Sequence, residues 1–272
     1  LFDPGMEAEV LAQETLAADM RHGLQDEEFV LHYQLQVDSG GTPLGVEALL
    51  RWNHARLGLM LPHQFLPMAE GTGMMIPLGH WVLQAACQQL LEWARQPQTA
   101  SWTLAVNVSA FQLAQADFAV DVANVLKATG APARQLRLEL TEGALLGDVE
   151  NVIAKMSAVH AIGVGFCLDD FGAGFASLAY LKRLPLVQLK IDQVMVRAVL
   201  TDDSVAVIAR AIVALGLSMG VPVIAEGVET AAQRDFFSAL GCHAFQGNYI
   251  GVAALPAAIL DDYLNNRPQV HV

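Results

Sequence analysis

The sequence predicts an α/β protein that folds as a single closed (β/α)8 barrel. Two observations predict it: strands and helices alternate regularly from about residue 103 onward, and two earlier strands bring the total to about eight. Alternating strands and helices predict a parallel sheet covered by helices, and eight strands suit a closed barrel. An open doubly wound sheet is the alternative, but no G-x-G-x-x-G motif opens a helix here.

The N-terminal part is predicted to hold a helix followed by a strand pair. Apolar residues recur at helical spacing over residues 4–24, and we interpret residues 1–24 as a linker helix from an upstream GGDEF-like or sensor domain. Strands at 28–37 and 44–50 are joined by the tight turn Asp38-Ser39-Gly40-Gly41, so they should be antiparallel. Two helices should follow, at 62–69 and 81–94.

The rest of the barrel is predicted as six strand–helix units. The strands are expected at 103–108, 136–140, 164–168, 187–191, 221–225 and 244–245. The helices are expected at 118–127, 149–162, near 178, and at 203–217, 231–240 and 257–263. We therefore expect one domain over residues 25–265 and a short C-terminal tail at 266–272.

Composition limits the classes of function. The 272 residues are 54% hydrophobic, which is typical of a globular chain with a full core, and the first residue, Leu1, suggests a fragment of a longer protein. The formal net charge of −13 disfavours a nucleic acid polymer as partner. Cys87, Cys167 and Cys242 show no C-x-x-C spacing and predict buried thiols in a reducing compartment, not a zinc site.

Charged and polar residues stand at the ends of successive predicted strands. They are Glu47 with Arg51, then Asn107, Glu139, Asp169 with Asp170, Lys190 with Asp192, Glu226, and Gln246. In a barrel of this type, the active site lies where the strands end. Period-two alternation puts Lys190 and Asp192 on one face of their strand, so we expect both to point into the barrel.

Asp169 and Asp170 come directly after an apolar strand and before a loop with two glycines. Oxygen-only ligands suit Mg²⁺, Mn²⁺ or Ca²⁺, and several buried carboxylates need compensating charge. The alternative for each residue taken alone is an ordinary polar turn. Asp170-Phe171-Gly172 matches the metal-binding triplet of protein kinases, but the H-R-D-x-x-x-x-N loop of kinases is missing. The H-E-x-x-H motif of zinc metalloproteases and the G-x-S-x-G motif of serine hydrolases are missing too.

Seven motifs in order resemble those of the EAL domains, the cyclic di-GMP phosphodiesterases, from about Phe29 to Leu260. The motifs are Glu47-Ala48-Leu49-Leu50-Arg51, Asn107-Val108-Ser109, Glu139-Leu140-Thr141-Glu142, Asp169-Asp170-Phe171-Gly172, Leu189-Lys190-Ile191-Asp192, Ala225-Glu226-Gly227-Val228-Glu229-Thr230 and Gln246-Gly247. The resemblance implies hydrolysis of cyclic di-GMP to linear pGpG in a barrel whose first strand is antiparallel.

The resemblance also implies roles for individual residues. Two divalent cations, Mg²⁺ or Mn²⁺ with Ca²⁺ inhibitory, would be held by Glu47, Asn107, Glu139, Asp169, Asp170 and Glu226. Lys190, Glu226 and Glu47 would be catalytic, with Lys190 contacting the attacking water. Arg51, Gln246 and Asp192 would contact substrate, while Glu142 and Glu229 would stabilise loops.

The resemblance further implies a homodimer formed through the segment after Asp170, including the short helix near Leu178 to Leu181. It implies a cytoplasmic location and no membrane contact by this fragment. The fragment would belong to a larger bacterial signalling protein, either a membrane-tethered protein or a sensor. Leu1-Phe2-Asp3-Pro4 resembles the joint between a GGDEF and an EAL domain.

Three departures from the family pattern bear on substrate affinity or loop geometry. Leu35 stands in place of Pro, Asn248 in place of Tyr, and Val252-Ala253 in place of Arg-Pro. Two alternatives to an enzyme stay open: a catalytically silent cyclic di-GMP receptor, since some members of the family bind without cleaving, and a partner-binding module. Receptors typically lose the glutamate of the first motif or one aspartate of the pair, and this chain retains all three, which favours the enzyme.

Overall fold

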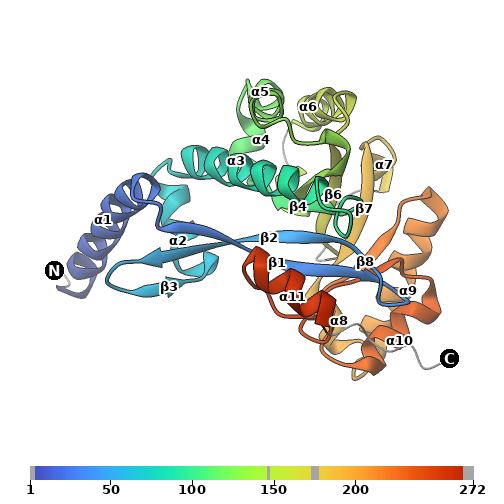
Figure 1. Ribbon diagram of the computed structural model, residues 1–272. Coiled ribbons are helices and arrows are strands. Elements are labelled where there is room, and N and C mark those ends of the chain that lie inside the picture. The colour runs from blue at the N-terminus through green and yellow to red at the C-terminus, as the bar shows by residue number, and fades with distance from the viewer. Residues whose placement is uncertain (1–3, 146–147, 173–177, 266–272) are drawn as a thin grey trace.

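A computed structural model describes residues 4–145, 148–172 and 178–265. Eight strands close into a barrel in the order β1, β2, β4, β5, β6, β7, β8, β9, and the pairing of β1 with β2 completes the ring. The strands are β1 Phe29–Asp38, β2 Pro43–His54, β3 Gly58–Met60, β4 Thr103–Asn107, β5 Leu136–Thr141, β6 Gly165–Phe171, β7 Leu186–Ile191, β8 Val223–Ala225 and β9 Ala244–Phe245. The (β/α)8 prediction is confirmed (Figure 1).

The first strand runs against its neighbours, as predicted. β1 pairs antiparallel with both β2 and β9, and every other neighbouring pair around the ring is parallel. A turn as short as that between β1 and β2 leaves no room for a crossover helix, so the two strands must be antiparallel.

Helices cover the outside of the barrel (Figure 1). They are α1 Pro4–Gln25, α2 Pro62–Gly71, α3 Met75–Ala94, α4 Ala110–Ala114, α5 Phe118–Thr129, α6 Val149–Ala161, α7 Leu178–Leu181, α8 Gln193–Ala198, α9 Asp203–Met219, α10 Ala231–Leu240 and α11 Pro256–Asn265. Two short 3₁₀ turns, Ala133–Gln135 and Glu142–Leu145, flank β5. Helix α9 begins at the capping side chain of Asp202 and ends at Gly220, whose φ of 68° terminates the helix.

The sequence did not predict β3, α4 or α8. Each has three to six residues, which is too short for hydrophobic periodicity to be visible. β3 extends the end of β2 as a hairpin, in which Trp52 lies opposite Met60. Helix α4 begins at Ser109, whose side chain caps the backbone N–H of Gln112.

Two separate apolar clusters stabilise the fold. The larger one lies between the barrel strands and the surrounding helices. The smaller one joins α1, α2 and the start of α3 to the β1–β2 pair, and Met20 of α1 and Trp52 of β2 are fully buried in it. Figure 1 shows α1 lying beside α2 at the end of the molecule where β3 lies. Helix α1 is therefore packed onto the barrel by residues of its last turns.

None of the helices in the described ranges combines the length and apolar character that a membrane crossing requires.

Candidate active site

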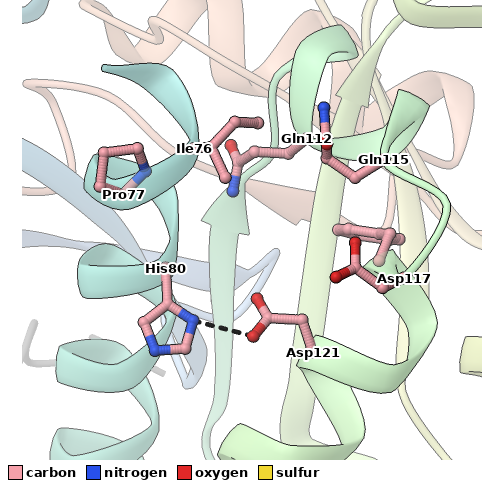
Figure 2. Close-up of a pocket in the computed structure, with 8 residues that line it drawn as sticks. Ile76, Pro77, His80, Gln112, Gln115, Asp117 and Asp121 are labelled. Atoms are coloured by element: carbon pink, nitrogen blue, oxygen red, sulfur yellow. Dashed lines mark hydrogen bonds and ion pairs between the residues drawn. The ribbon is translucent and has the colours of Figure 1, made fainter. Parts of the chain in front are cut away.

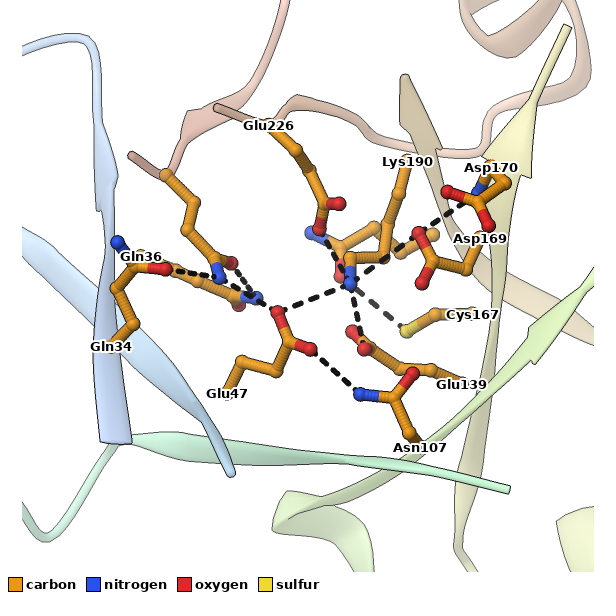
Figure 3. Close-up of polar contacts among 12 residues, drawn as sticks. Gln34, Gln36, Glu47, Asn107, Glu139, Cys167, Asp169, Asp170, Lys190 and Glu226 are labelled. Carbon is orange, nitrogen blue, oxygen red and sulfur yellow. Dashed lines mark hydrogen bonds and ion pairs between the residues drawn. The ribbon is translucent and has the colours of Figure 1, made fainter. Parts of the chain in front are cut away.

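Lys190 lies at the centre of a buried cluster of carboxylates inside the barrel (Figure 3). Its Nζ atom is 2.5 Å from Oε1 of Glu226 and 2.6 Å from Oε2 of Glu139. Glu47 Oε2 and Asp169 Oδ1 lie at 3.4 Å and 3.6 Å. The lysine side chain has no exposed surface. One ammonium thus faces four carboxyl groups.

Parallel register brings these side chains to one mouth of the barrel. Asn107 of β4 lies opposite Glu139 of β5, and Thr141 of β5 lies opposite Asp169 of β6. Glu226 follows directly after β8. Because neighbouring strands end at the same edge, motifs that are far apart in the chain converge there, as the sequence predicts.

Glu47 is held by amide side chains on both of its oxygens. Asn107 Nδ2 donates to Oε1 at 2.7 Å, and Gln246 Nε2 donates to Oε2 at 2.7 Å. Since Asn107 uses its nitrogen in this bond, its own oxygen is left for another partner. Burial favours the neutral form of Glu47, but the charge of Lys190 and these hydrogen bonds outweigh it and lower the pKa of Glu47.

Burial and crowding have the opposite effect on other carboxylates of the cluster. Burial is the largest influence on both Glu139 and Glu226, and it raises the pKa of each well above its usual value. For Glu139 the nearby Glu47 adds to this rise. Burial also lowers the pKa of Lys190, yet the surrounding carboxylates outweigh it and raise that pKa well above normal. Lys190 therefore stays protonated.

Asp170 adopts an uncommon backbone conformation next to Asp169. Its φ is 52°, in the left-handed region, and its N–H donates to Oδ1 of Asp169 at 2.9 Å. Burial, the charge of Asp169 and a hydrogen bond with Asp192 raise the pKa of Asp170 to about 6. The backbone of Asp170 is therefore held by the side chain of Asp169 near the end of β6.

The donor set fits a divalent cation. Glu47, Glu139 and Glu226 each offer one carboxylate oxygen, and these oxygens lie within 4.8 Å of one another. Oε1 of Glu139 is buried and finds no hydrogen-bond partner among the described residues. Carboxylate oxygens are the ligands that hard divalent cations prefer. The acidic cluster could therefore bind metal.

A cavity of about 240 Å³ opens above the cluster. It is lined by Gln34, Glu47, Leu49, Asp170, Gln193, Arg197, Glu226, Gly227, Glu229, Gln246, Gly247 and Asn248. Arg51 lies two residues beyond Leu49 on the same face of β2. Arg197 and Glu229 form an ion pair, with Arg197 Nη2 at 3.0 Å from Glu229 Oε1.

Three further expected roles concern Asp192, Glu142 and Glu229, of which Glu229 lines this cavity. Asp192 caps α8, accepting a hydrogen bond from the N–H of Val194 at 2.5 Å. Glu142 is buried directly after β5, and the resemblance implies that it anchors the loop after Asp170, of which residues 173–177 lie outside the described residues. The substrate-binding role of Asp192, the anchoring role of Glu142 and the loop-stabilising role of Glu229 stay predictions.

Gln34 and Gln36 also belong to the site, although they were not predicted from the sequence. Both lie on β1, where they alternate with the buried apolar residues Tyr33, Leu35 and Val37. The signal in the sequence is the spacing of Gln34 and Gln36, because two amides two positions apart lie on the same face of a buried strand. Arg197 was also missed, because it lies on the short helix α8.

A second cavity, of about 400 Å³, lies on the outside of the barrel between α3 and α5 (Figure 2). Its wall includes His80 and Asp121, whose Nδ1 and Oδ1 atoms are 2.9 Å apart. None of the predicted site residues lines it. This cavity is therefore separate from the acidic cluster.

Comparison with known proteins gives one family. The model of the EAL domain matches residues 17–253. Two Pseudomonas aeruginosa proteins are similar: the bifunctional diguanylate cyclase/cyclic di-GMP phosphodiesterase MucR, 43% identical over 92% of this chain and 36% of its own length, and the cyclic di-GMP phosphodiesterase NbdA, 36% identical over 90% and 31%.

The chain therefore spans about a third of the length of those two relatives. Among solved structures, the PaMucR phosphodiesterase in complex with c-di-GMP superposes with a TM-score of 0.87 at 42% identity, covering 90% of this chain and 99% of that one. The EAL enzyme Bd1971 gives 0.86 at 29% identity, covering 93% and 69%. Both the sequence motifs and the barrel agree with these comparisons, and the chain belongs to the EAL domain family.

Proposed function

We propose that this domain hydrolyses cyclic di-GMP to linear pGpG in a reaction that depends on divalent cations. The observation that carries the proposal is the convergence of four carboxylates on Lys190 beneath an open cavity. The similarity to relatives named as cyclic di-GMP phosphodiesterases and to a c-di-GMP complex supports the choice of substrate.

In this proposal the cations are held by Glu47, Asn107, Glu139, Asp169, Asp170 and Glu226. When bound, Mg²⁺ or Mn²⁺ would polarise the phosphodiester and make a water molecule more acidic. We propose two cations because the resemblance to the EAL family implies a pair, and the adjacent carboxylates of Asp169 and Asp170 would help to hold them.

The chain's own side chains would orient the reactants. Lys190 is protonated and cannot bind a cation, so its N–H groups would orient the attacking water and stabilise charge that develops on the phosphate. Arg51 would pair with a phosphate of the substrate, and Gln246 and Asp192 would line its binding site. Because the protein is strongly acidic, an anionic dinucleotide needs the positive charges of Lys190, Arg51 and the bound cations in order to bind.

The experiment that tests the function is incubation of the domain with cyclic di-GMP and MgCl₂, with chromatography of the products. We expect pGpG from the wild type, and none from Glu47→Gln, which loses a carboxylate ligand. Binding of cyclic di-GMP without any product would support the receptor alternative. Neither binding nor product would support the partner-binding module.

We also propose that the domain forms a homodimer through the region after Asp170. Residues 173–177 of that region lie outside the described residues. In the helix that follows, Leu181 is buried and Tyr180 is 43% exposed. Sedimentation over a range of concentrations tests this proposal, and a monomer mass at every concentration in a fully active protein would contradict it.

A further inference from the structure

Gln36 lies on the inward face of β1 and is almost completely buried, with 3% of its surface exposed. Its Nε2 atom donates a hydrogen bond to Oε1 of Gln246 at 2.9 Å. The residue opposite it on β2 is Gly45, which has no side chain to compete for the amide. Figure 3 shows Gln36 beside Gln34, on the side of the cluster nearest Glu47. At this depth, Gln36 has almost no surface with which to contact a ligand in the cavity.

The amide of Gln246 is used on both its oxygen and its nitrogen. Oε1 accepts from Gln36, while Nε2 donates to Oε2 of Glu47 at 2.7 Å and to Oε1 of Gln34 at 3.1 Å. Gln34 is fixed in turn, because its own Nε2 donates to the carbonyl of Gly251 at 2.9 Å. A side-chain amide offers two N–H donors and one oxygen, so these three contacts define which way it faces.

The direction of the Gln246 amide matters for Glu47. If the amide rotated by half a turn, its oxygen would face the carboxylate of Glu47, and two acceptors would repel each other. Gln36 opposes that rotation, because it offers a donor on the side where Oε1 now lies. The position of Glu47 therefore depends on Gln36, although none of the hydrogen bonds in the described part of the chain joins these two residues directly.

We propose that Gln36 is a positioning residue of the metal centre, acting through Gln246 to hold the carboxylate of Glu47 in place for a divalent cation. The inference rests on the proposed function in one respect, namely that Glu47 is a metal ligand. Groups that orient metal ligands in this way typically change metal affinity or activity by about 10- to 100-fold when they are replaced. A role limited to stability would leave metal affinity unchanged.

The test is a double-mutant cycle in which Mn²⁺ binding is measured by calorimetry. The four proteins are the wild type, Gln36→Met, Gln246→Met and the double variant. We expect Gln36→Met to weaken Mn²⁺ binding about 10-fold in the wild-type background. In the Gln246→Met background it should cause no further loss, because no amide is left for it to orient.

Thr99→Val is the matched control. Thr99 is fully buried, and its hydroxyl donates to the carbonyl of Trp93 at 2.8 Å, away from the cluster. Its replacement removes a buried hydrogen bond and should lower stability, yet leave Mn²⁺ affinity unchanged. If Gln36→Met does not fold, Gln36→Asn replaces it in the cycle, since the shorter side chain keeps the amide but withdraws the donor from Gln246.

Wild-type Mn²⁺ affinity in the Gln36 variants would overturn the inference. So would an equal loss of affinity in both backgrounds, because Gln36 would then act by a route other than Gln246. Assaying hydrolysis of cyclic di-GMP by the wild type separates this question from the proposed function. Mn²⁺ binding without hydrolysis would contradict the phosphodiesterase proposal, while the binding cycle would still decide the role of Gln36.

Discussion

Nζ of Lys190 lies 2.6 Å from Oε2 of Glu139, and neither side chain has any surface exposed to solvent. A pair this deeply buried is stabilising only while both partners are present, because either one alone would be an unpaired charge. Here the lysine also faces Glu47, Asp169 and Glu226. The same ammonium therefore compensates charge in the metal-free protein and lies beside the proposed metal ligands.

Lys190→Met should affect both stability and turnover. In EDTA at pH 8, its loss leaves the carboxylates uncompensated and should cost about 3–5 kcal/mol of unfolding free energy. Added Mn²⁺ should recover most of that loss, while turnover stays about 10²- to 10³-fold below wild type. Thermal unfolding and hydrolysis assays check this, with the exposed Lys127→Met as control. Wild-type turnover in the variant would refute a catalytic role.

Removal of divalent cations should abolish activity. The cluster offers oxygen ligands and an unsatisfied carboxylate oxygen on Glu139, so excess EDTA should stop hydrolysis of cyclic di-GMP. Mg²⁺ or Mn²⁺ should restore it. Ca²⁺ should inhibit by replacing them, because it is larger and less demanding of octahedral geometry. Undiminished hydrolysis in EDTA would contradict the metal requirement.

Asp170→Asn should stabilise the metal-free protein at neutral pH but not near pH 4, because the difference develops between about pH 4 and pH 6. The folded-state pKa of Asp170 is raised to about 6, so the folded protein binds this proton more tightly than the unfolded chain does. Stability from this group is therefore fully present below about pH 4, is lost as pH rises from about 4 to about 6, and changes no further above that.

We expect Asp170→Asn to be more stable than wild type by about 1 kcal/mol at pH 7.5, after allowance for solvent screening of a half-exposed group. Near pH 4 the difference should vanish. Asn tolerates the left-handed backbone of this position, so the substitution adds no strain. Chemical unfolding in EDTA at both pH values is the measurement, and an equal difference at both would show that repulsion is not the cause.

Met20→Ala should destabilise the domain by about 2–5 kcal/mol, the usual cost of truncating a fully buried methionine. Met20 packs in the smaller apolar cluster with Phe29 and Trp52, so the loss should appear in the unfolding of the whole domain. Arg21→Ala, at the exposed neighbouring position, should change stability by less than about 0.5 kcal/mol. A loss for Met20→Ala in urea unfolding that is as small as the one expected for Arg21→Ala would mean that burial of Met20 does not stabilise the fold.

Local sequence signals were sufficient to predict the barrel and most of the acidic cluster. Strand periodicity and the switch to helical spacing depend on neighbouring residues, so the alternation from β4 to α11 could be predicted, as could the antiparallel start. The strand-end residues Glu47, Glu139, Asp169, Lys190 and Glu226 followed from the same pattern. A barrel brings its strand ends together whatever the details of packing.

Other features of the site were decided only by tertiary structure. The bond from Gln36 to Gln246 joins residues 210 positions apart, and no local pattern shows which inward amide meets which. Aspartate adopts the left-handed region more often than most residues do, but the local sequence does not show that Asp170 does so, because that φ depends on its setting at the mouth of the barrel. Likewise, the helical period of α1 identifies an apolar face, but burial of Met20 against Trp52 requires the folded β1–β2 pair. Periodicity determines which way a side chain points, whereas packing between distant segments determines what it meets.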